Sequence, residues 1–141
     1  MTNSVFKTLL YGVCLTATAP VFAQTGPLTT ALNAQLSVSG EMSIHKFQLL
    51  LQDGFKSVIV NRPDQEIGNL VSVNQLRNIA EELHVGVIYQ PISSGKVSNT
   101  DIIEFAKYYN ELPKPILMVC RSGSRSSLLF NQAKSQGLLN E

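Results

Sequence analysis

The chain has 141 residues, and its 11 basic and 10 acidic side chains leave a formal net charge of +1. This length predicts one domain. The charges form no basic patch or tail, which argues against nucleic-acid binding by neutralisation of phosphates.

Residues 1–23 have the pattern of a secretory signal peptide. Lys7 precedes a short apolar stretch, and Val21-Phe22-Ala23 provides the small residues that a signal peptidase recognises. A membrane anchor is the alternative, but the stretch is short for a span and contains Pro20. We therefore expect cleavage after Ala23, a periplasmic or secreted location, and no stable membrane anchor after cleavage.

Cleavage at this position would leave a single cysteine in the chain. Cys14 lies within the expected signal peptide, and Cys120 remains. Exported proteins normally pair their cysteines. Three roles stay open for Cys120: a catalytic thiol, a buried inert side chain, or a bridge between two chains.

Residues 24–33 contain Gly26 and Pro27 and predict a flexible lead-in, and residues 34–141 predict an α/β domain. Short apolar runs predict strands, and apolar residues at helical spacing predict helices. The strands are expected over 34–38 at a sheet edge, 57–60, 85–89 and 116–119; the helices over 43–52, from 72, from 98, and over about 126–135. Alternating strands and helices predict a mostly parallel sheet with right-handed crossovers and helices on both faces.

Two of the expected helices begin with capping boxes, Ser72 with Gln75 and Ser98 with Asp101. Their apolar spacing also predicts which side chains face the core. These side chains are Ile44, Phe47, Leu50 and Leu51 in the first helix, Val73, Leu76, Ile79, Ala80 and Leu83 in the second, and Ile102, Ile103, Phe105, Ala106 and Tyr109 in the third.

The segment Cys120-Arg121-Ser122-Gly123-Ser124-Arg125-Ser126 follows the apolar run 116–119 and leads into a helix. Such a turn can direct backbone N–H groups inward, and the partial positive charge of a helix N-terminus favours both an anion and a thiolate. Arg125 can grip two oxygens of an anion. A buried cysteine or a surface arginine alone would be structural, but together they predict covalent catalysis on an anionic group. Cys120 would be the nucleophile and Arg125 the clamp, with Arg121, Ser122, Gly123, Ser124 and Ser126 around the anion.

Three loops, over 61–71, 90–97 and 120–125, are expected at the carboxyl edge of the sheet, where ligands bind in this class of fold. Asp64 in the first loop is the candidate general acid. Alternatively it is a turn residue, and Arg62 pairs with Asp64 or Glu66. Two further questions stay open. Arg121 points either to substrate or to solvent, and Ser126 either takes part in the site or serves only as a helix cap.

Metal and cofactor sites are not expected. His45 and His84 have no carboxylate or cysteine at ligand spacing, so the sequence predicts no metal site. The chemistry of the cysteine loop requires no organic cofactor. The expected partner is a small anionic or phosphorylated substrate. The sequence gives no indication of how many copies of the chain associate.

Four segments resemble, in order, the phosphatase-like domain of the beta-lactamase-hydrolase-like proteins. They are Ser37-Val38-Ser39-Gly40, Asp53-Gly54-Phe55-Lys56-Ser57-Val58-Ile59, Asn61-Arg62-Pro63-Asp64-Gln65-Glu66, and the cysteine loop. The resemblance spans about Leu36 to Ala133. It implies a fold like that of the dual-specificity and tyrosine phosphatases, with Cys120 as nucleophile, Arg125 as anion clamp and Ser126 assisting release of the thiol group.

The cysteine loop departs from the tyrosine phosphatase pattern. Four residues separate Cys120 from Arg125, where those enzymes have five, and Val119 stands where they usually have histidine. Dual-specificity phosphatases carry a general-acid aspartate after a segment like Pro91-Ile92, where this chain has serines. The shorter loop is the length that rhodaneses, the sulfur transferases, use.

These observations lead to three functional hypotheses. The first is an exported cysteine-dependent phosphatase-like hydrolase that forms a phosphocysteine. The second is a rhodanese-type sulfur transferase that carries sulfur as a Cys120 persulfide, which the loop length favours. The third is an anion-binding module without turnover, which the missing general acid favours.

Overall fold

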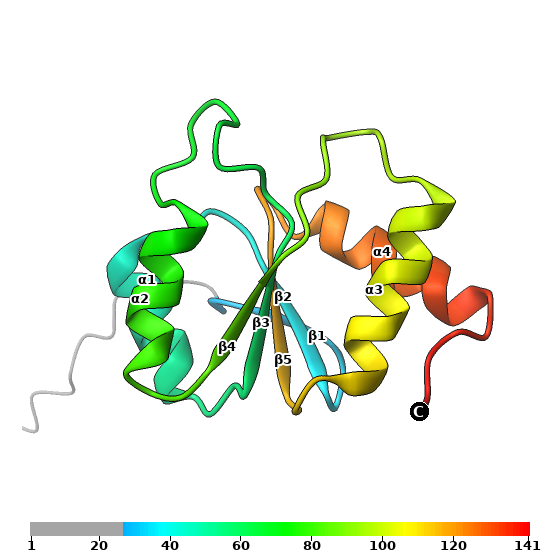
Figure 1. The fold of residues 1–141 in the computed structure, drawn as a ribbon, viewed down its shortest axis with the longest axis horizontal. Helices are drawn as coiled ribbons and strands as arrows, with labels where there is room; N and C mark the ends of the chain where they lie inside the picture. Colours follow the sequence, from blue (N-terminus) through cyan, green and yellow to red (C-terminus); the bar gives the residue numbers. More distant parts are fainter. Residues whose placement is uncertain (1–26) are drawn as a thin grey trace, which may run out of the picture.

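A computed structural model describes residues 27–141 as one five-stranded sheet flanked by four helices (Figure 1). The expected signal peptide and the first three residues of the expected lead-in lie outside the described residues. The strands are β1 (Thr30–Asn33), β2 (Leu36–Ser39), β3 (Ser57–Val60), β4 (Gly86–Tyr89) and β5 (Ile116–Val119). The helices are α1 (Ile44–Gln52), α2 (Val73–Glu81), α3 (Asn99–Glu111) and α4 (Ser124–Ser135).

The sheet has the strand order β1-β2-β5-β3-β4. The pairs β2–β5, β5–β3 and β3–β4 are parallel, which confirms the predicted mostly parallel sheet, and β1 pairs antiparallel with β2. Val119 of β5 pairs with Ser39 of β2 and with Val60 of β3, and Val60 pairs in turn with Tyr89 of β4. These are the last residues of their strands, so the four parallel strands end at one level. The segments that follow them therefore emerge side by side.

Two predictions at the start of the domain are wrong. Residues 30–33, expected in a flexible lead-in, form β1, and the strand expected at the edge is the inner strand β2. The pairing of β1 with β2 is the reason, because the short antiparallel partner takes the edge and supplies hydrogen bonds that a local pattern does not reveal.

The helices cover both faces, α1 and α2 on one and α3 and α4 on the other (Figure 1). Both predicted capping boxes are present, at Ser72 and at Ser98. Helix α4 begins at Ser124, two residues earlier than predicted, because Gly123 occupies the N-cap with a left-handed backbone, φ 87°. Ser126 is therefore not the cap of this helix.

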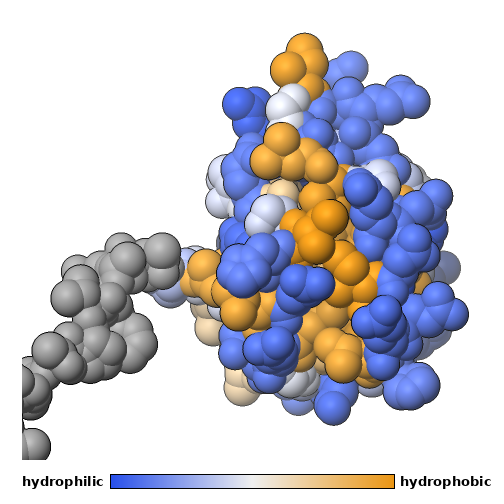
Figure 2. All heavy atoms as spheres, turned by 90° about the vertical axis from the view of Figure 1, so that its left-hand side faces the viewer, coloured by the Kyte–Doolittle hydropathy of each residue, from blue (hydrophilic) through white to orange (hydrophobic). Residues whose placement is uncertain are grey.

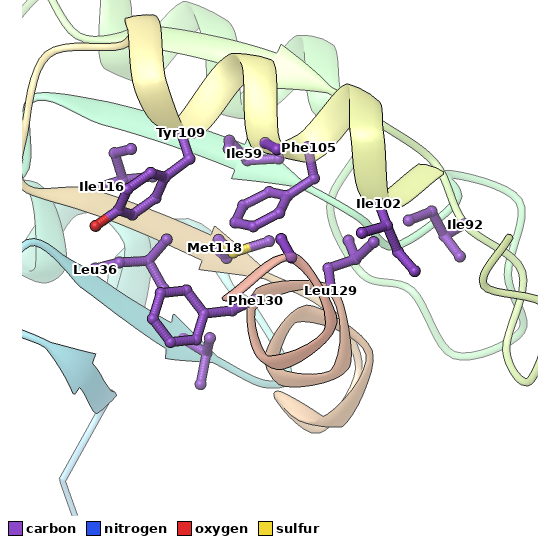
Figure 3. Packing of buried hydrophobic residues seen from close by; sticks show 13 residues of the cluster. Leu36, Ile59, Ile92, Ile102, Phe105, Tyr109, Ile116, Met118, Leu129 and Phe130 are labelled. Atoms are coloured by element: carbon purple, nitrogen blue, oxygen red, sulfur yellow. The ribbon is translucent and has the colours of Figure 1, made fainter. Parts of the chain in front are cut away.

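A buried cluster fills each face of the sheet. On one face, Phe105 and Tyr109 of α3 and Phe130 of α4 pack over Met118 in the central strand β5 (Figure 3). Of the side chains predicted to face inward, Ile44, Leu83 and Ile103 are instead exposed. Leu83 lies beyond the last residue of α2, and Ile103 is one helical step of about 100° away from the buried Ile102.

On the surface, hydrophobic side chains form a band over the side that carries α1 and α2 (Figure 2). Ile44 and Leu49 of α1 are among the exposed large apolar residues of the domain. Over residues 27–141, no helix combines the length and hydropathy needed to span a bilayer.

Candidate active site

The cysteine loop leaves the buried strand β5 and is held from the side by the end of β2. The Cys120 N–H donates to the Ser39 carbonyl over 3.1 Å, and the Glu41 N–H donates to the Arg121 carbonyl over 2.9 Å. A Cβ atom at Gly40 would lie only 3.0 Å from the Arg121 carbonyl oxygen. Glycine at position 40 therefore lets the two segments pack closely, which fixes the path of the loop.

Gly123 turns the loop into helix α4. Its positive φ places it in the left-handed region, which glycine adopts without strain. In this conformation its N–H points to the Cys120 sulfur, with an N···Sγ distance of 2.9 Å. The turn thus directs a backbone donor to the sulfur, as the sequence pattern predicts.

Cys120 is 1 % exposed, and its sulfur faces the start of α4. Burial raises the pKa of the Cys120 thiol. The Ser126 N–H, the Ser126 hydroxyl when it turns from Asn61, and the N–H groups of Ser122 and Arg125 favour the thiolate and outweigh burial, so that this pKa lies below its ordinary value. The loop therefore favours the thiolate, which is the nucleophilic form.

We expect the alkylation rate of Cys120 to rise with pH with a midpoint below about 8.5, the value of a free thiol. Ser126→Ala should move the midpoint upward, because the hydroxyl that can turn from Asn61 to donate to the thiolate is then absent. Rates of iodoacetamide reaction measured between acidic and alkaline pH test both expectations. A parent midpoint at or above that of a free thiol would show that the loop does not stabilise a thiolate.

Arg125 lies in the first turn of α4 and is 8 % exposed. Its Nη1 donates to the Ile92 carbonyl over 2.7 Å and lies 2.8 Å from Glu66 Oε2, and its Nη2 donates to Glu66 Oε1 over 2.9 Å. A guanidinium has five N–H donors. The Nε–H and one Nη2–H, which form a parallel pair, have no acceptor among residues 27–141. This edge of Arg125 can therefore bind two oxygens of an anion.

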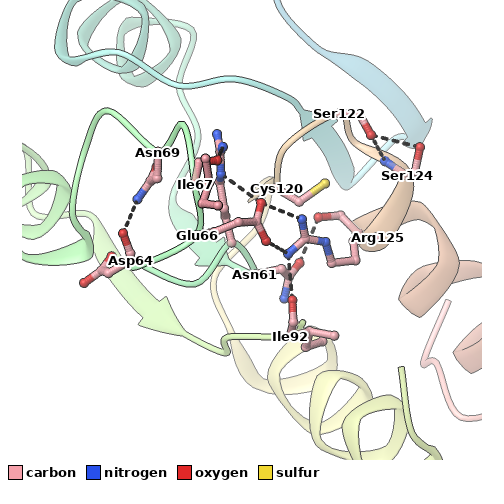
Figure 4. A network of polar contacts seen from close by, with 12 residues as sticks. Asn61, Asp64, Glu66, Ile67, Asn69, Ile92, Cys120, Ser122, Ser124 and Arg125 are labelled. Atoms are coloured by element: carbon pink, nitrogen blue, oxygen red, sulfur yellow. Dashed lines mark hydrogen bonds and ion pairs between the residues drawn. The ribbon is translucent and has the colours of Figure 1, made fainter. Parts of the chain in front are cut away.

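Glu66 holds Arg125 and is itself held by Arg62, whose Nε donates to Glu66 Oε1 over 3.1 Å. Figure 4 shows the carboxylate facing the Arg125 guanidinium. The Arg125 hydrogen bond lowers the pKa of Glu66, burial opposes this, and the charges of both arginines lower it further. Glu66 is therefore a carboxylate, and as such it cannot donate a proton to a leaving group.

Asn61 joins the three loops at the end of β3. Its Nδ2 donates to the Gln90 carbonyl over 3.1 Å, and its Oδ1 accepts the Ser126 hydroxyl over 2.8 Å. Its backbone N–H donates to Val119, and its carbonyl accepts the Ile92 N–H. Asn61 and Ser126 are both fully buried, so their hydrogen bond is shielded from water.

Asp64 does not join this cluster. Its Oδ1 accepts the Val73 N–H over 2.8 Å at the start of α2, and its own N–H donates to the Tyr89 hydroxyl over 2.9 Å. In Figure 4 it lies away from Cys120, on the far side of Glu66. This geometry matches the turn-residue interpretation, and Arg62 pairs with Glu66, one of the two partners expected for it.

We expect Asp64→Asn to change turnover less than about twofold, because the amide oxygen can still accept the Val73 N–H. Asp64→Ala should leave turnover similar but lower stability by about 1 kcal/mol, the usual net value of one hydrogen bond, because the Val73 N–H loses its acceptor. Initial rates with a phosphate ester whose alcohol is a poor leaving group measure the effect on turnover, and thermal melts measure the effect on stability. A selective rate loss in Asp64→Asn with that substrate would restore Asp64 as the acid.

Arg121, Ser122, Ser124 and Arg125 line a hollow of about 190 Å³ above the loop. Ser94, Gly95, Val97 and Leu128 complete its wall. The Ser122 hydroxyl donates to Ser124 Oγ over 3.0 Å at the rim. The hollow thus has Arg125 and three of the predicted anion-binding residues in its wall, whereas Cys120, Gly123 and Ser126 are buried or lie outside it.

Among residues 27–141, no group of three or more His, Cys, Asp or Glu side chains could hold a metal ion. The sequence did not identify Glu66 as the partner of Arg125, or Asn61 as the partner of Ser126. The only available signal was their position in Asn61-Arg62-Pro63-Asp64-Gln65-Glu66, at the carboxyl end of a strand.

The fold and the cysteine loop define an α/β domain of the cysteine-phosphatase type. The chain belongs to the family described as "Beta-lactamase hydrolase-like protein, phosphatase-like domain", whose model matches residues 29–137. It is 28% identical over 99 residues to the beta-lactamase hydrolase-like protein of Agrobacterium fabrum, covering 70% of this chain and 23% of that protein. The chain therefore spans about a quarter of the length of this curated relative.

Solved structures share the fold. A candidate phosphatase from Neisseria meningitidis has a TM-score of 0.73 and 26% identity, covering 79% of this chain and 80% of that chain. Tk-PTP in its active form has a TM-score of 0.62 and 20% identity, covering 79% of this chain and 76% of the other. These likenesses agree with the family assignment and with the predicted dual-specificity-like fold.

Proposed function

We propose that the chain is a cysteine-dependent phosphatase-like hydrolase that acts on a small phosphorylated substrate. The observation that carries this proposal is that one loop holds the Cys120 sulfur against a backbone N–H and leads directly into Arg125, whose Nε–Nη2 edge has no acceptor among residues 27–141. Phosphoryl transfer depends mainly on positioning and on stabilisation of charge.

In the first step, the Cys120 thiolate forms a bond to phosphorus, and the bond from phosphorus to the leaving oxygen breaks. The loop N–H groups and Arg125 stabilise the charge on the phosphoryl oxygens. Water then attacks the phosphocysteine, giving inorganic phosphate and the thiolate. To donate to the departing sulfur, the Ser126 hydroxyl has to turn from Asn61 Oδ1, which accepts its hydrogen in the structure.

In this proposal no side chain acts as a general acid that protonates the leaving group. Glu66 is ionised between two arginines, and the Asp64 carboxylate accepts the Val73 N–H at the start of α2. We therefore expect substrates whose leaving group departs without protonation, such as an aryl phosphate, to react fastest.

The signal-peptide pattern of residues 1–23 supports export of the protein. The periplasm or the exterior of the cell is the proposed location.

A second candidate, a rhodanese-type sulfur transferase, is favoured by the four residues between Cys120 and Arg125. In that reaction Cys120 accepts a sulfane sulfur from thiosulfate and releases sulfite, and a thiol acceptor then takes the sulfur. Parallel assays of one preparation with an aryl phosphate and with thiosulfate plus a thiol distinguish the candidates. Phosphate binding without either turnover would identify an anion-binding module.

A further inference from the structure

Arg62 has a buried guanidinium that the proposed reaction does not use. The residue is 3 % exposed, and each of its three nitrogens has a partner. Nε donates to Glu66 Oε1, Nη1 to Glu41 Oε1 and Nη2 to the Ile67 carbonyl, each over 3.1 Å. Burial of a charge is costly unless it is paired and hydrogen-bonded, and Arg62 meets both conditions.

Arg62 holds a carboxylate whose segment has no helix or strand to position it. Glu66 lies in the loop between β3 and α2, and this loop bends around the Arg62 guanidinium. The Ile67 carbonyl accepts from Arg62, and a Cβ atom at Gly68 would lie 3.5 Å from Arg62 Nη2. Arg62 therefore fixes both the side chain of Glu66 and the backbone that follows it.

The orientation of Glu66 decides which edge of Arg125 is free. Both carboxylate oxygens pair with the Nη1–Nη2 end of Arg125, which leaves the Nε–Nη2 edge without an acceptor among the described residues. Arg62 binds Oε1, so the carboxylate cannot rotate without breaking that bond. A freely rotating carboxylate could take the Nε–Nη2 edge and block an anion.

Charge leads to the same conclusion. Arg62 and Arg125 share the single negative charge of Glu66, whereas the side chain of Glu41 is 57% exposed and therefore screened by water. The three side chains retain a net positive charge beside Cys120. Without Arg62, Glu66 would neutralise Arg125 alone, and the attraction of the site for an anion would fall.

We propose that Arg62 is a positioning residue: it fixes Glu66 so that Arg125 presents its Nε–Nη2 edge and a net positive charge to an anion at the cysteine loop. This inference rests on the anion-clamp role of Arg125 in the proposed function. It does not require turnover, because the sulfur-transfer and binding-module alternatives use the same clamp.

The test measures how much inorganic phosphate, or in a separate arm thiosulfate, halves the alkylation rate of Cys120 in the full chain. Arg62→Met should weaken phosphate protection about tenfold, the value of one charged hydrogen bond. Arg62→Lys keeps the charge and should lose less. Arg77→Met removes an exposed arginine of α2 as a matched control and should change protection less than about twofold.

Glu66→Gln, alone and combined with Arg62→Met, shows whether Arg62 acts through Glu66. In the Glu66→Gln background, Arg62→Met still removes one positive charge but no longer frees a carboxylate to bind Arg125, so it should add a loss well below tenfold. A full tenfold additional loss of phosphate protection in that background would overturn the proposal. Unchanged phosphate protection in a folded Arg62→Met protein whose melting temperature alone is lower would also overturn it. The second result would mean that Arg62 merely fastens the loop.

NMR of the unmodified protein provides a readout that needs no variant. Phosphate should shift the Nε–H resonance of Arg125 and leave that of Arg62 in place, because only Arg125 exchanges its environment. Displacement of the Arg62 resonance by phosphate would overturn the proposal, as would absence of Cys120 protection by either anion. Protection without turnover, by contrast, would reject the hydrolase and support the role of Arg62.

Discussion

Replacing Cys120 with serine is expected to reduce hydrolysis of an aryl phosphate by about 10⁴-fold or more, in the range seen when other enzymes lose their nucleophile. A serine hydroxyl has a far higher pKa than the thiol, and the loop donors that favour a thiolate cannot ionise it at neutral pH. Initial rates under saturating substrate measure the effect.

Cys120→Ser should still bind phosphate, because the loop N–H groups and Arg125 remain. Equilibrium binding of phosphate to this variant therefore controls for folding. A variant that binds phosphate and keeps more than a tenth of the parent rate would show that Cys120 is not the nucleophile. Loss of sulfur transfer together with phosphatase activity would show that both reactions use one thiol.

Replacing Arg125 with lysine is expected to lower turnover about 100-fold although the charge is retained, as for loss of one oxyanion donor. Lysine cannot present two parallel N–H donors to an anion. It also cannot bind both Glu66 oxygens and the Ile92 carbonyl with the geometry that the guanidinium has. The clamp and its support would fail together.

Arg77→Lys, on the exposed side of α2, provides the matched control and should keep the parent rate. Separate values of kcat and KM from steady-state rates show at which stage the fork acts. A fall in kcat indicates a contact that strengthens in the transition state, and a change in KM alone indicates ground-state binding. An Arg125→Lys variant with unchanged kcat/KM would exclude Arg125 as the clamp.

The sequence by itself determined the features that depend on neighbouring residues. The capping boxes at Ser72 and Ser98 join residues three apart, so they could be predicted from spacing. The same holds for the apolar run of β5 and for a glycine-containing turn with an inward N–H group, although the left-handed Gly123 starts α4 two residues earlier than predicted. The mostly parallel sheet followed from the alternation of such local elements.

Only the tertiary structure decided the partners that complete the site. Glu66 and Arg125 are 59 residues apart, and Asn61 and Ser126 are 65 apart. Their contacts arise because β3 and β5 are neighbours in the sheet and end in register, which no local pattern encodes. For the same reason, the sequence could not decide whether Asp64 or Glu66 pairs with Arg62, because this depends on which carboxylate the loop turns toward α4. One is bound by the N-terminus of α2 and the other by two arginines, so loop packing rather than residue type separated them.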